Sequence, residues 1–151
     1  MESNSIVTIM NDDNSTFGKD HRVQYSLIAF TGTINRHAAK STELTEADLE
    51  QFRTSIWESI PALPTRSKQN QFPKLYVEIV YNEGFNNGHF GDLRQLIKTE
   101  PKEGDYKKVK SYNDLTVDFS ALIELLRANK GEGKAIKEIK VKTNADIKME
   151  V

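Results

Sequence analysis

Two stretches of the chain alternate in polarity in the way that β-strands do. Along residues 22–34 both alternating sets become apolar or aromatic in the middle, which is typical of a strand buried on two faces. Along residues 75–82 apolar side chains alternate with a more polar set, which is typical of a half-buried strand. We therefore expect a central strand at 22–34 and a second strand at 75–82.

The segment between these strands carries the signals of a helix. Thr45 can cap its amino terminus together with Asp48, three residues later. Apolar residues then recur every three or four positions, and Pro61 and Pro64 predict an end at about Ser59. The apolar face consists of Leu49, Phe52, Ile56, Ile60 and Leu63, with Trp57 beside it.

Shorter elements flank this core. No repeat or linker interrupts the chain, so we predict a single α+β domain over residues 1–151. The remaining predicted elements are a strand at 6–10, a loop at 82–91, a short helix at 93–98 capped by Asp92, a solvated connection at 99–111, a helix from Asp118 that stops at Gly131, and strands at 135–142 and 147–151.

Composition excludes several classes of protein. The chain has 151 residues, of which 37% are hydrophobic, so its core needs neither metal nor disulfides. It has no cysteine, which removes thiolate catalysis, Cys-ligated zinc and iron–sulfur clusters and fits a reducing cytoplasm. No apolar run is long enough to cross a bilayer, and the first residues carry no export signal. We expect a cytoplasmic protein without a membrane partner.

The charged and titratable residues give no catalytic pattern. His21, His37 and His89 lack the carboxylate or histidine spacing of a metal site, and no nucleophile elbow occurs. The glycines at 84–91 do not have the spacing of a phosphate-binding loop. The 21 basic residues against 22 acidic ones leave a formal charge of -1, so any contact with nucleic acid must come from a local patch. We predict no catalytic residue, no metal and no cofactor.

One loop has the composition of such a patch. Residues 64–73 hold a guanidinium, an ammonium, two hydroxyls, three carboxamides and one aromatic ring, and no acid occurs between Ile60 and Lys74. These polar groups can donate to phosphate oxygens and to the 2′-hydroxyl, and the ring can stack on a base. The alternative is a polar loop whose side chains bond to their own backbone. A smaller basic cluster lies at 19–22.

Several motifs together resemble a known family. In order along residues 15–100, they are Ser15-Thr16-Phe17-Gly18-Lys19-Asp20-His21-Arg22-Val23, Gly32-Thr33-Ile34-Asn35, the helix introduced by Leu44-Thr45, Thr65-Arg66-Ser67-Lys68 followed by Phe72-Pro73, and Gly91-Asp92-Leu93. This series is similar to the carboxy-terminal half of the repeated backbone subunit of CRISPR Cascade complexes. That subunit is the seventh Cas protein family, and the closest resemblance is to its subtype I-B branch.

The resemblance implies a fold and a domain organisation. The expected fold is an RNA-recognition-motif-like (ferredoxin-like) palm, incomplete, with part of a thumb hairpin. Residues 1–21 would be the returning arm of the thumb, 22–98 the palm core, and 99–151 a connection, a helix and the terminal strands. A palm without its amino-terminal half would leave an apolar strand edge unpaired, which predicts a partner chain such as the missing half supplied in trans.

The resemblance also implies a function and its residues. Family members stack into a filament along guide RNA and hold its backbone, and they are scaffolds of type I Cascade rather than nucleases. The implied partners are guide RNA, other copies of the subunit, other Cascade subunits and, through the guide, target DNA. Phe72 is expected to anchor its loop to the core. The implied RNA-binding residues are Arg66, Lys68, Gln69 and Asn70 in the loop, and Lys19, His21 and Arg22 where the thumb returns to the palm.

Two other functions stay open at this point. The first is a ribonuclease of the RNA-recognition-like CRISPR group, in which His21 or His37 acts as general acid or base beside a backbone-binding loop. The second is a protein-interaction module without nucleic acid, which the near-neutral charge permits. RNA cleavage would identify the ribonuclease, and failure to bind RNA at low salt would identify the interaction module.

Overall fold

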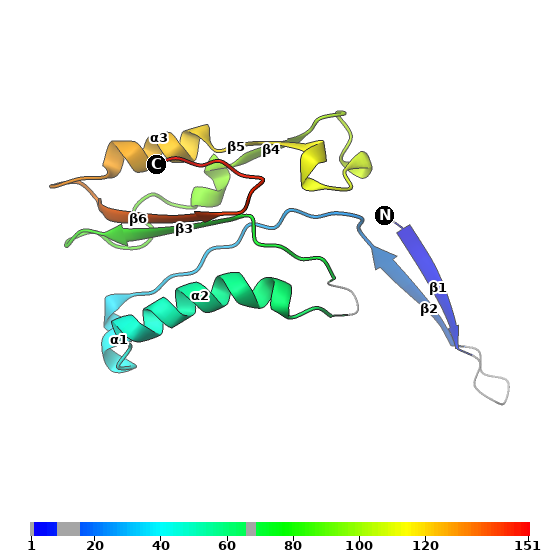
Figure 1. Ribbon diagram of the computed structural model, residues 1–151, viewed down its shortest axis with the longest axis horizontal. Helices are drawn as coiled ribbons and strands as arrows, with labels where there is room; N and C mark the ends of the chain where they lie inside the picture. Colours follow the sequence, from blue (N-terminus) through cyan, green and yellow to red (C-terminus); the bar gives the residue numbers. More distant parts are fainter. Residues whose placement is uncertain (1, 9–15, 66–68) are drawn as a thin grey trace. The chain divides into compact units, whose positions relative to one another are not determined.

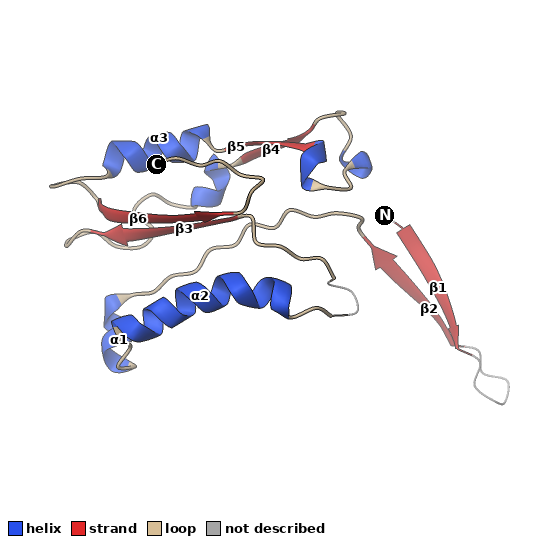
Figure 2. Cartoon of the chain, in the orientation of Figure 1, coloured by secondary structure: helices blue, strands red, loops and turns tan. Residues whose placement is uncertain are grey.

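The computed structural model describes residues 2–8, 16–65 and 69–151 of the chain (Figure 1). These residues form three α-helices and three separate two-stranded antiparallel sheets, so the predicted α+β class is confirmed (Figure 2). The chain divides into two compact units. We call residues 1–30 with 98–118 the hairpin unit and residues 31–97 with 119–151 the helical unit. The RNA-recognition-like palm and the three-part domain organisation stay predictions.

The hairpin unit contains two antiparallel strand pairs. Strand β1 (Glu2–Thr8) pairs with β2 (Thr16–Arg22). Strand β4 (Lys98–Pro101) pairs with β5 (Leu115–Asp118), and two 3₁₀ turns, Tyr106–Lys108 and Tyr112–Asp114, lie between them. The connection predicted at 99–111 therefore contains most of a strand. The lysines and acids of this segment led to the prediction of a solvated connection. Strands at the edge of a sheet also carry charged side chains, so charge alone does not exclude a strand.

The predicted central strand at 22–34 is wrong. Strand β2 ends at Arg22, and residues 25–35 have no regular secondary structure. Ile28 is 68% exposed and Phe30 is 65% exposed. A strand needs a neighbour to complete its backbone hydrogen bonds, and a strand that is apolar on both sides needs cover on both faces. Among the described residues no strand pairs with this segment, so the apolar pattern alone does not make it a strand.

The helical unit is built on the pair of strands β3 (Leu75–Tyr81) and β6 (Ile136–Thr143). Helix α3 (Ser120–Asn129) contacts β6 and the 3₁₀ turn η1 (Leu93–Leu96). Figure 1 shows α3 beside this strand pair. The core of the unit lies here, because all its buried hydrophobic side chains among the described residues come from α3, β6 and their flanks. They are Leu122, Leu126, Ala135, Ile136, Ile147 and Met149.

Helix α2 (Glu46–Ala62) starts where its sequence signals predict. The Asp48 backbone N–H donates to Thr45 Oγ1 at 3.2 Å, and the Thr45 N–H donates to the Asp48 carboxylate at 2.8 Å, which completes a capping box. The helix runs past the predicted end and includes Pro61. Pro61 has no backbone N–H to donate, so one hydrogen bond of the last turn is absent. The Leu63 N–H still donates to the Ser59 carbonyl at 3.1 Å. The short helix α1 (Arg36–Ser41) precedes it.

Three other boundaries differ from the predictions. The short helix expected at 93–98 is only the 3₁₀ turn η1, and α3 starts two residues later than Asp118. The strand expected at 147–151 is not formed, although Ile147 and Met149 are buried as its alternation predicts. The Arg127 guanidinium donates to the Glu150 carbonyl at 2.8 Å, so a side chain of α3 occupies a backbone group that a strand neighbour would need.

Candidate nucleic-acid interface

The loop predicted to bind RNA joins the end of α2 to the start of β3. Arg66 and Lys68 lie outside the described residues. Gln69 and Asn70 are described, and both are exposed. Asn70 adopts a backbone φ of 61°, in the left-handed region that asparagine tolerates better than most residues. The described part of the loop therefore presents carboxamide side chains to solvent, as a nucleic-acid contact requires.

The prediction that Phe72 anchors this loop to the core is wrong. Its side chain is 60% exposed. The buried side chains of the helical unit among the described residues come from α3, from β6 and from the segments beside them, and the loop contributes none of them. An aromatic side chain that is left in solvent beside carboxamides is available to a ligand instead.

A cavity of about 280 Å³ lies against this part of the loop. Its walls come from two segments that are close in space: the end of α2 with Pro64, and the loop from Gln69 to Phe72. We call it the 69–72 cavity. Its lining residues are Ile60, Pro61, Pro64, Gln69, Asn70, Gln71 and Phe72, and none of them carries a charge.

The second basic cluster lies on β2, in the hairpin unit. In the ladder with β1, Lys19 is opposite Ser5, His21 is opposite Ser3 and Arg22 is opposite Glu2. The loop belongs to the helical unit. That Lys19, His21 and Arg22 contact the same RNA as the loop stays a prediction.

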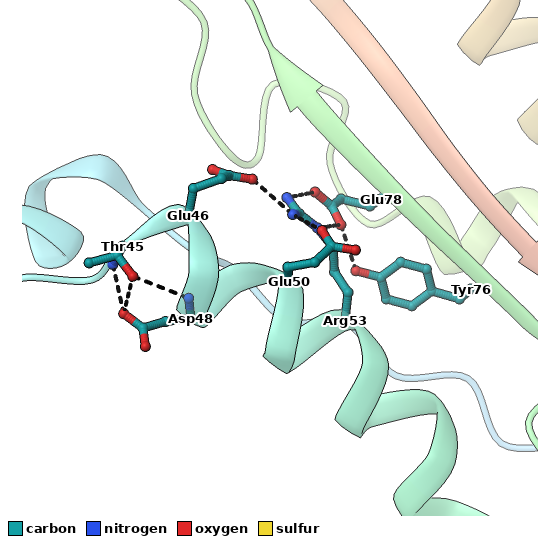
Figure 3. A network of polar contacts seen from close by, with 7 residues as sticks. All are labelled: Thr45, Glu46, Asp48, Glu50, Arg53, Tyr76 and Glu78. Atoms are coloured by element: carbon teal, nitrogen blue, oxygen red, sulfur yellow. Dashed lines mark hydrogen bonds and ion pairs between the residues drawn. The ribbon is translucent and has the colours of Figure 1, made fainter.

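A network of charged side chains fixes the two elements that carry the loop (Figure 3). We call Arg53, Glu46, Glu50, Glu78 and Tyr76 the Arg53 cluster. Arg53 on α2 donates through Nε and Nη2 to the two carboxylate oxygens of Glu78 on β3, both at 2.8 Å. Its Nη1 donates to Glu50 at 2.8 Å and to Glu46 at 2.9 Å. Two parallel hydrogen bonds fix both the distance and the orientation of the Arg53 guanidinium relative to the Glu78 carboxylate. Helix α2 is therefore held against β3 at this point.

The cluster shifts the acidity of its members. Hydrogen bonds from Arg53 and, to a lesser extent, from Tyr76 hold the pKa of Glu78 below its usual value, against the opposing effect of burial. Burial, together with the bond to Glu78, raises the pKa of Tyr76 to about 12. The Tyr76 hydroxyl therefore stays a donor at neutral pH, and it lies 2.8 Å from Glu78.

A second contact joins α2 to the same face of the strand pair. Lys140 lies directly opposite Glu78, and Lys142 lies directly opposite Tyr76, so these four side chains share one face. The Lys142 ammonium lies 5.0 Å from the centre of the Trp57 ring on α2, a cation–π distance. Helix α2, on which the loop starts, is thus joined to β3 by Arg53 and Glu78 and to the neighbouring strand β6 by Trp57 and Lys142.

Sequence reasoning missed the Arg53 cluster. A signal existed, because Glu46, Glu50 and Arg53 lie seven and three residues apart along one helix and so share a side. The decisive partner, Glu78, is 25 residues away and could not be found by spacing. The predicted apolar face was also partly wrong, because Phe52 is 47% exposed and Leu63 is 73% exposed. Arg53 lies on the sheet-facing side of α2 in their place.

Comparison with known proteins decides the family. The family model described as CRISPR-associated protein Cas7 matches residues 1–120. The chain belongs to the Cas7 family. This confirms the family that the sequence motifs indicated, whereas the subtype I-B branch stays a prediction. No solved structure matches the chain significantly.

A curated relative supports the same assignment. The Cas7 protein of Haloferax volcanii, described as CRISPR-associated protein Cas7, is 36% identical over 108 residues. That match covers 71% of this chain but 31% of the relative. The chain therefore spans about a third of the length of this Cas7 protein. Within the described residues, no helix is both long and apolar enough to span a bilayer.

Proposed function

We propose that this Cas7-family chain is part of a subunit that binds CRISPR guide RNA and serves as a non-catalytic backbone of a type I Cascade complex. The observation that carries the proposal is the match of the Cas7 family over residues 1–120. In this proposal, copies stack along the guide and contact other Cascade subunits, and the guide pairs with target DNA. The fold of the whole subunit is an RNA-recognition-like palm with a thumb.

The loop at 64–73 makes the main RNA contact in this proposal. Arg66 and Lys68 neutralise phosphates, while Gln69 and Asn70 donate to phosphate or sugar oxygens. Two features support this assignment. The loop has no acid to repel a phosphate, and its described carboxamides are exposed. Lys19, His21 and Arg22 on β2 also contact the RNA in this proposal.

A salt titration tests the loop. We expect the chain to bind a mixed-sequence single-stranded RNA of 20 nucleotides, and log affinity to fall linearly with log salt concentration. Replacing Arg66 or Lys68 by alanine should reduce that slope by about 0.7 to 1 each, because each variant loses one phosphate contact. Affinity should fall by a similar factor for RNAs of different sequence. Fluorescence anisotropy at several salt concentrations measures both quantities.

Lys107→Ala is the matched control for this titration. Lys107 is an exposed lysine in the 3₁₀ turn after β4, so its removal changes the net charge by the same amount. The control should leave the slope unchanged. Equal slopes for the parent chain, Arg66→Ala and Lys68→Ala would remove the loop from the RNA interface. Failure of the parent chain to bind at low salt would reject RNA binding as a whole.

The non-catalytic part of the proposal has its own test. His37 is exposed in the first turn of α1, where its backbone N–H donates to Asn35 Oδ1 at 2.8 Å. We expect no cleavage when end-labelled RNA is incubated with the chain, and identical gel patterns for the parent chain and His37→Ala. Cleavage by the parent chain that disappears in His37→Ala would support the ribonuclease instead.

Contact with other protein chains is also part of the proposal. The apolar segment at 23–34 supports it, because Val23 is 64% exposed and Ile34 is 50% exposed, in addition to Ile28 and Phe30. Large apolar side chains exposed along one segment of a chain are typical of surfaces that other chains cover. We propose that another chain of the complex covers this segment.

A further inference from the structure

The 69–72 cavity has the size of a small-ligand site. Its volume of about 280 Å³ is several times the roughly 30 Å³ that one water takes up in the liquid. It lies just below the roughly 300 to 1,000 Å³ of pockets that hold whole drug-sized ligands. A volume of this size can take up a single ring system.

The lining of the cavity favours an uncharged, flat ligand with polar edges. Gln69, Asn70 and Gln71 each provide a carbonyl acceptor and an amide donor. Ile60, with two prolines, provides an apolar wall. None of the described residues that line the cavity is a cation, so this part of the lining offers a phosphate no charged partner. Carboxamides that both donate and accept are suited to the edge of a base, whose donors and acceptors alternate.

Phe72 supplies the remaining feature. Its side chain lines the cavity and is 60% exposed, so part of it is open to a ligand. Proteins that bind single-stranded RNA stack unpaired bases on such rings and read the base edges by hydrogen bonds. A flat apolar face beside a set of carboxamides is the combination that this recognition needs.

We propose that the 69–72 cavity binds one unstacked base of a single-stranded RNA, with the base stacked on Phe72 and its edge bonded to the carboxamides of Gln69, Asn70 and Gln71. This inference rests on the proposed RNA binding and adds a base subsite to a contact that is otherwise made to the RNA backbone. It assigns the loop two roles. Gln69 and Asn70 keep their proposed contact with the RNA backbone, and their carboxamides also bond to the edge of the base.

The test compares the chain with Phe72→Ala on two probes. One probe is the mixed-sequence 20-nucleotide RNA, and the other is an oligomer of the same length made of abasic ribose spacers. We expect Phe72→Ala to lower affinity for the RNA about tenfold, because one stacked base is lost. Affinity for the abasic oligomer should be the same for both proteins. The salt slope should not change, because no phosphate contact is removed.

Phe72→Tyr and Phe72→Leu are the matched variants. Tyrosine keeps the ring and should bind RNA within twofold of the parent chain, whereas leucine keeps apolar bulk without a π face and should behave like alanine. Since Phe72 is 60% exposed, its truncation opens no cavity in the core. Circular dichroism of each variant checks that the chain is folded, and the abasic probe tests base binding on the parent protein without any substitution.

The outcomes separate the base subsite from RNA binding itself. Equal RNA affinity of Phe72→Ala and the parent chain, while Arg66→Ala still weakens binding, overturns the base subsite and leaves the proposed function intact. An equal loss on both probes also overturns it, because the ring would then act through the loop and not through a base. A change only in self-association on sizing columns would make Phe72 a protein contact. If the parent chain binds neither probe, both proposals fail.

Discussion

Replacing Leu126 by alanine is expected to lower the free energy of unfolding by about 3 kcal/mol. Leu126 on α3 has no exposed surface, and it shares that property with Ile136 on β6. Truncation removes apolar contacts and leaves a cavity between the helix and the strand pair, whose close packing limits collapse. Urea denaturation followed by far-UV circular dichroism measures the change, which should shift the midpoint without changing the slope of the transition.

Leu63→Ala provides the matched control for this substitution. The chemical change is the same, but Leu63 is 73% exposed at the end of α2. Its removal should change the free energy of unfolding by less than about 0.5 kcal/mol. Equal losses for the two variants would contradict the placement of the core between α3 and β6.

The elements that the sequence predicted correctly are those with complete local signals. Thr45 and Asp48 form their capping box within one turn of chain, so neither depends on distant residues for the bond. The predicted bounds of strand β3 agree closely with the observed ones, because apolar and more polar side chains alternate along it and turn-forming segments flank it on both sides. Residue propensities and the period of the apolar pattern are enough to predict an element when the interactions that determine it lie within a few residues of each other.

The errors lie where a distant partner decides the outcome. The segment at 23–34 has the apolar pattern of a buried strand, yet Ile28 and Phe30 are exposed, because pairing and cover must come from other parts of a chain. The segment at 147–151 alternates apolar and charged residues as a half-buried strand does, but Arg127 on α3 donates to the Glu150 carbonyl and no strand forms. Periodicity predicts which face of a segment is apolar but not which neighbour will cover it.

The candidate site shows the same division. Its position between α2 and β3 and its lack of acids could be predicted, because both depend on the order of residues alone. The exposure of Phe72 could not be predicted from the sequence, because it depends on where the core of the helical unit lies. The Arg53 cluster could not be predicted either, because a charged side chain on a helix is normally exposed to solvent. Only the structure shows that Glu78 lies within hydrogen-bonding distance of Arg53.

Breaking the Arg53 cluster should give the second large loss of stability. Arg53→Met keeps an unbranched apolar side chain but removes the guanidinium and its five hydrogen-bond donors. It leaves Glu78, whose side chain is only 20% exposed, without its bidentate partner. We expect the free energy of unfolding at pH 7 to fall by about 2 kcal/mol, less than for a fully buried pair because solvent reaches Glu78. Urea denaturation measures it, and Lys107→Met, at an exposed site, should change little.

The cluster also makes stability depend on pH in a predictable direction. Because the bond from Arg53 lowers the pKa of Glu78 in the folded chain, this carboxylate stabilises the fold above its unfolded value of about 4.3. That contribution is lost as the pH falls through the lower folded pKa. We expect Glu78→Gln to be less stable than the parent chain at pH 7, and the difference between them to shrink steadily as the pH falls from 5 to 2.

The difference between the two proteins isolates Glu78 from the other acids. The pKa values of Asp48, Asp92 and Asp114 are also lowered by hydrogen bonds. The donors are Thr45 for Asp48, Arg94 for Asp92, and the Lys110 backbone with the Ser111 side chain and backbone for Asp114, so both proteins lose stability in acid. Those losses cancel in the comparison. Glu58→Gln, an exposed acid on the same helix, should show no such narrowing with pH. A stability gap between parent and Glu78→Gln that stayed constant from pH 7 to pH 2 would mean that the charge of Glu78 does not hold α2 to β3. The loop at 64–73 would then need another support.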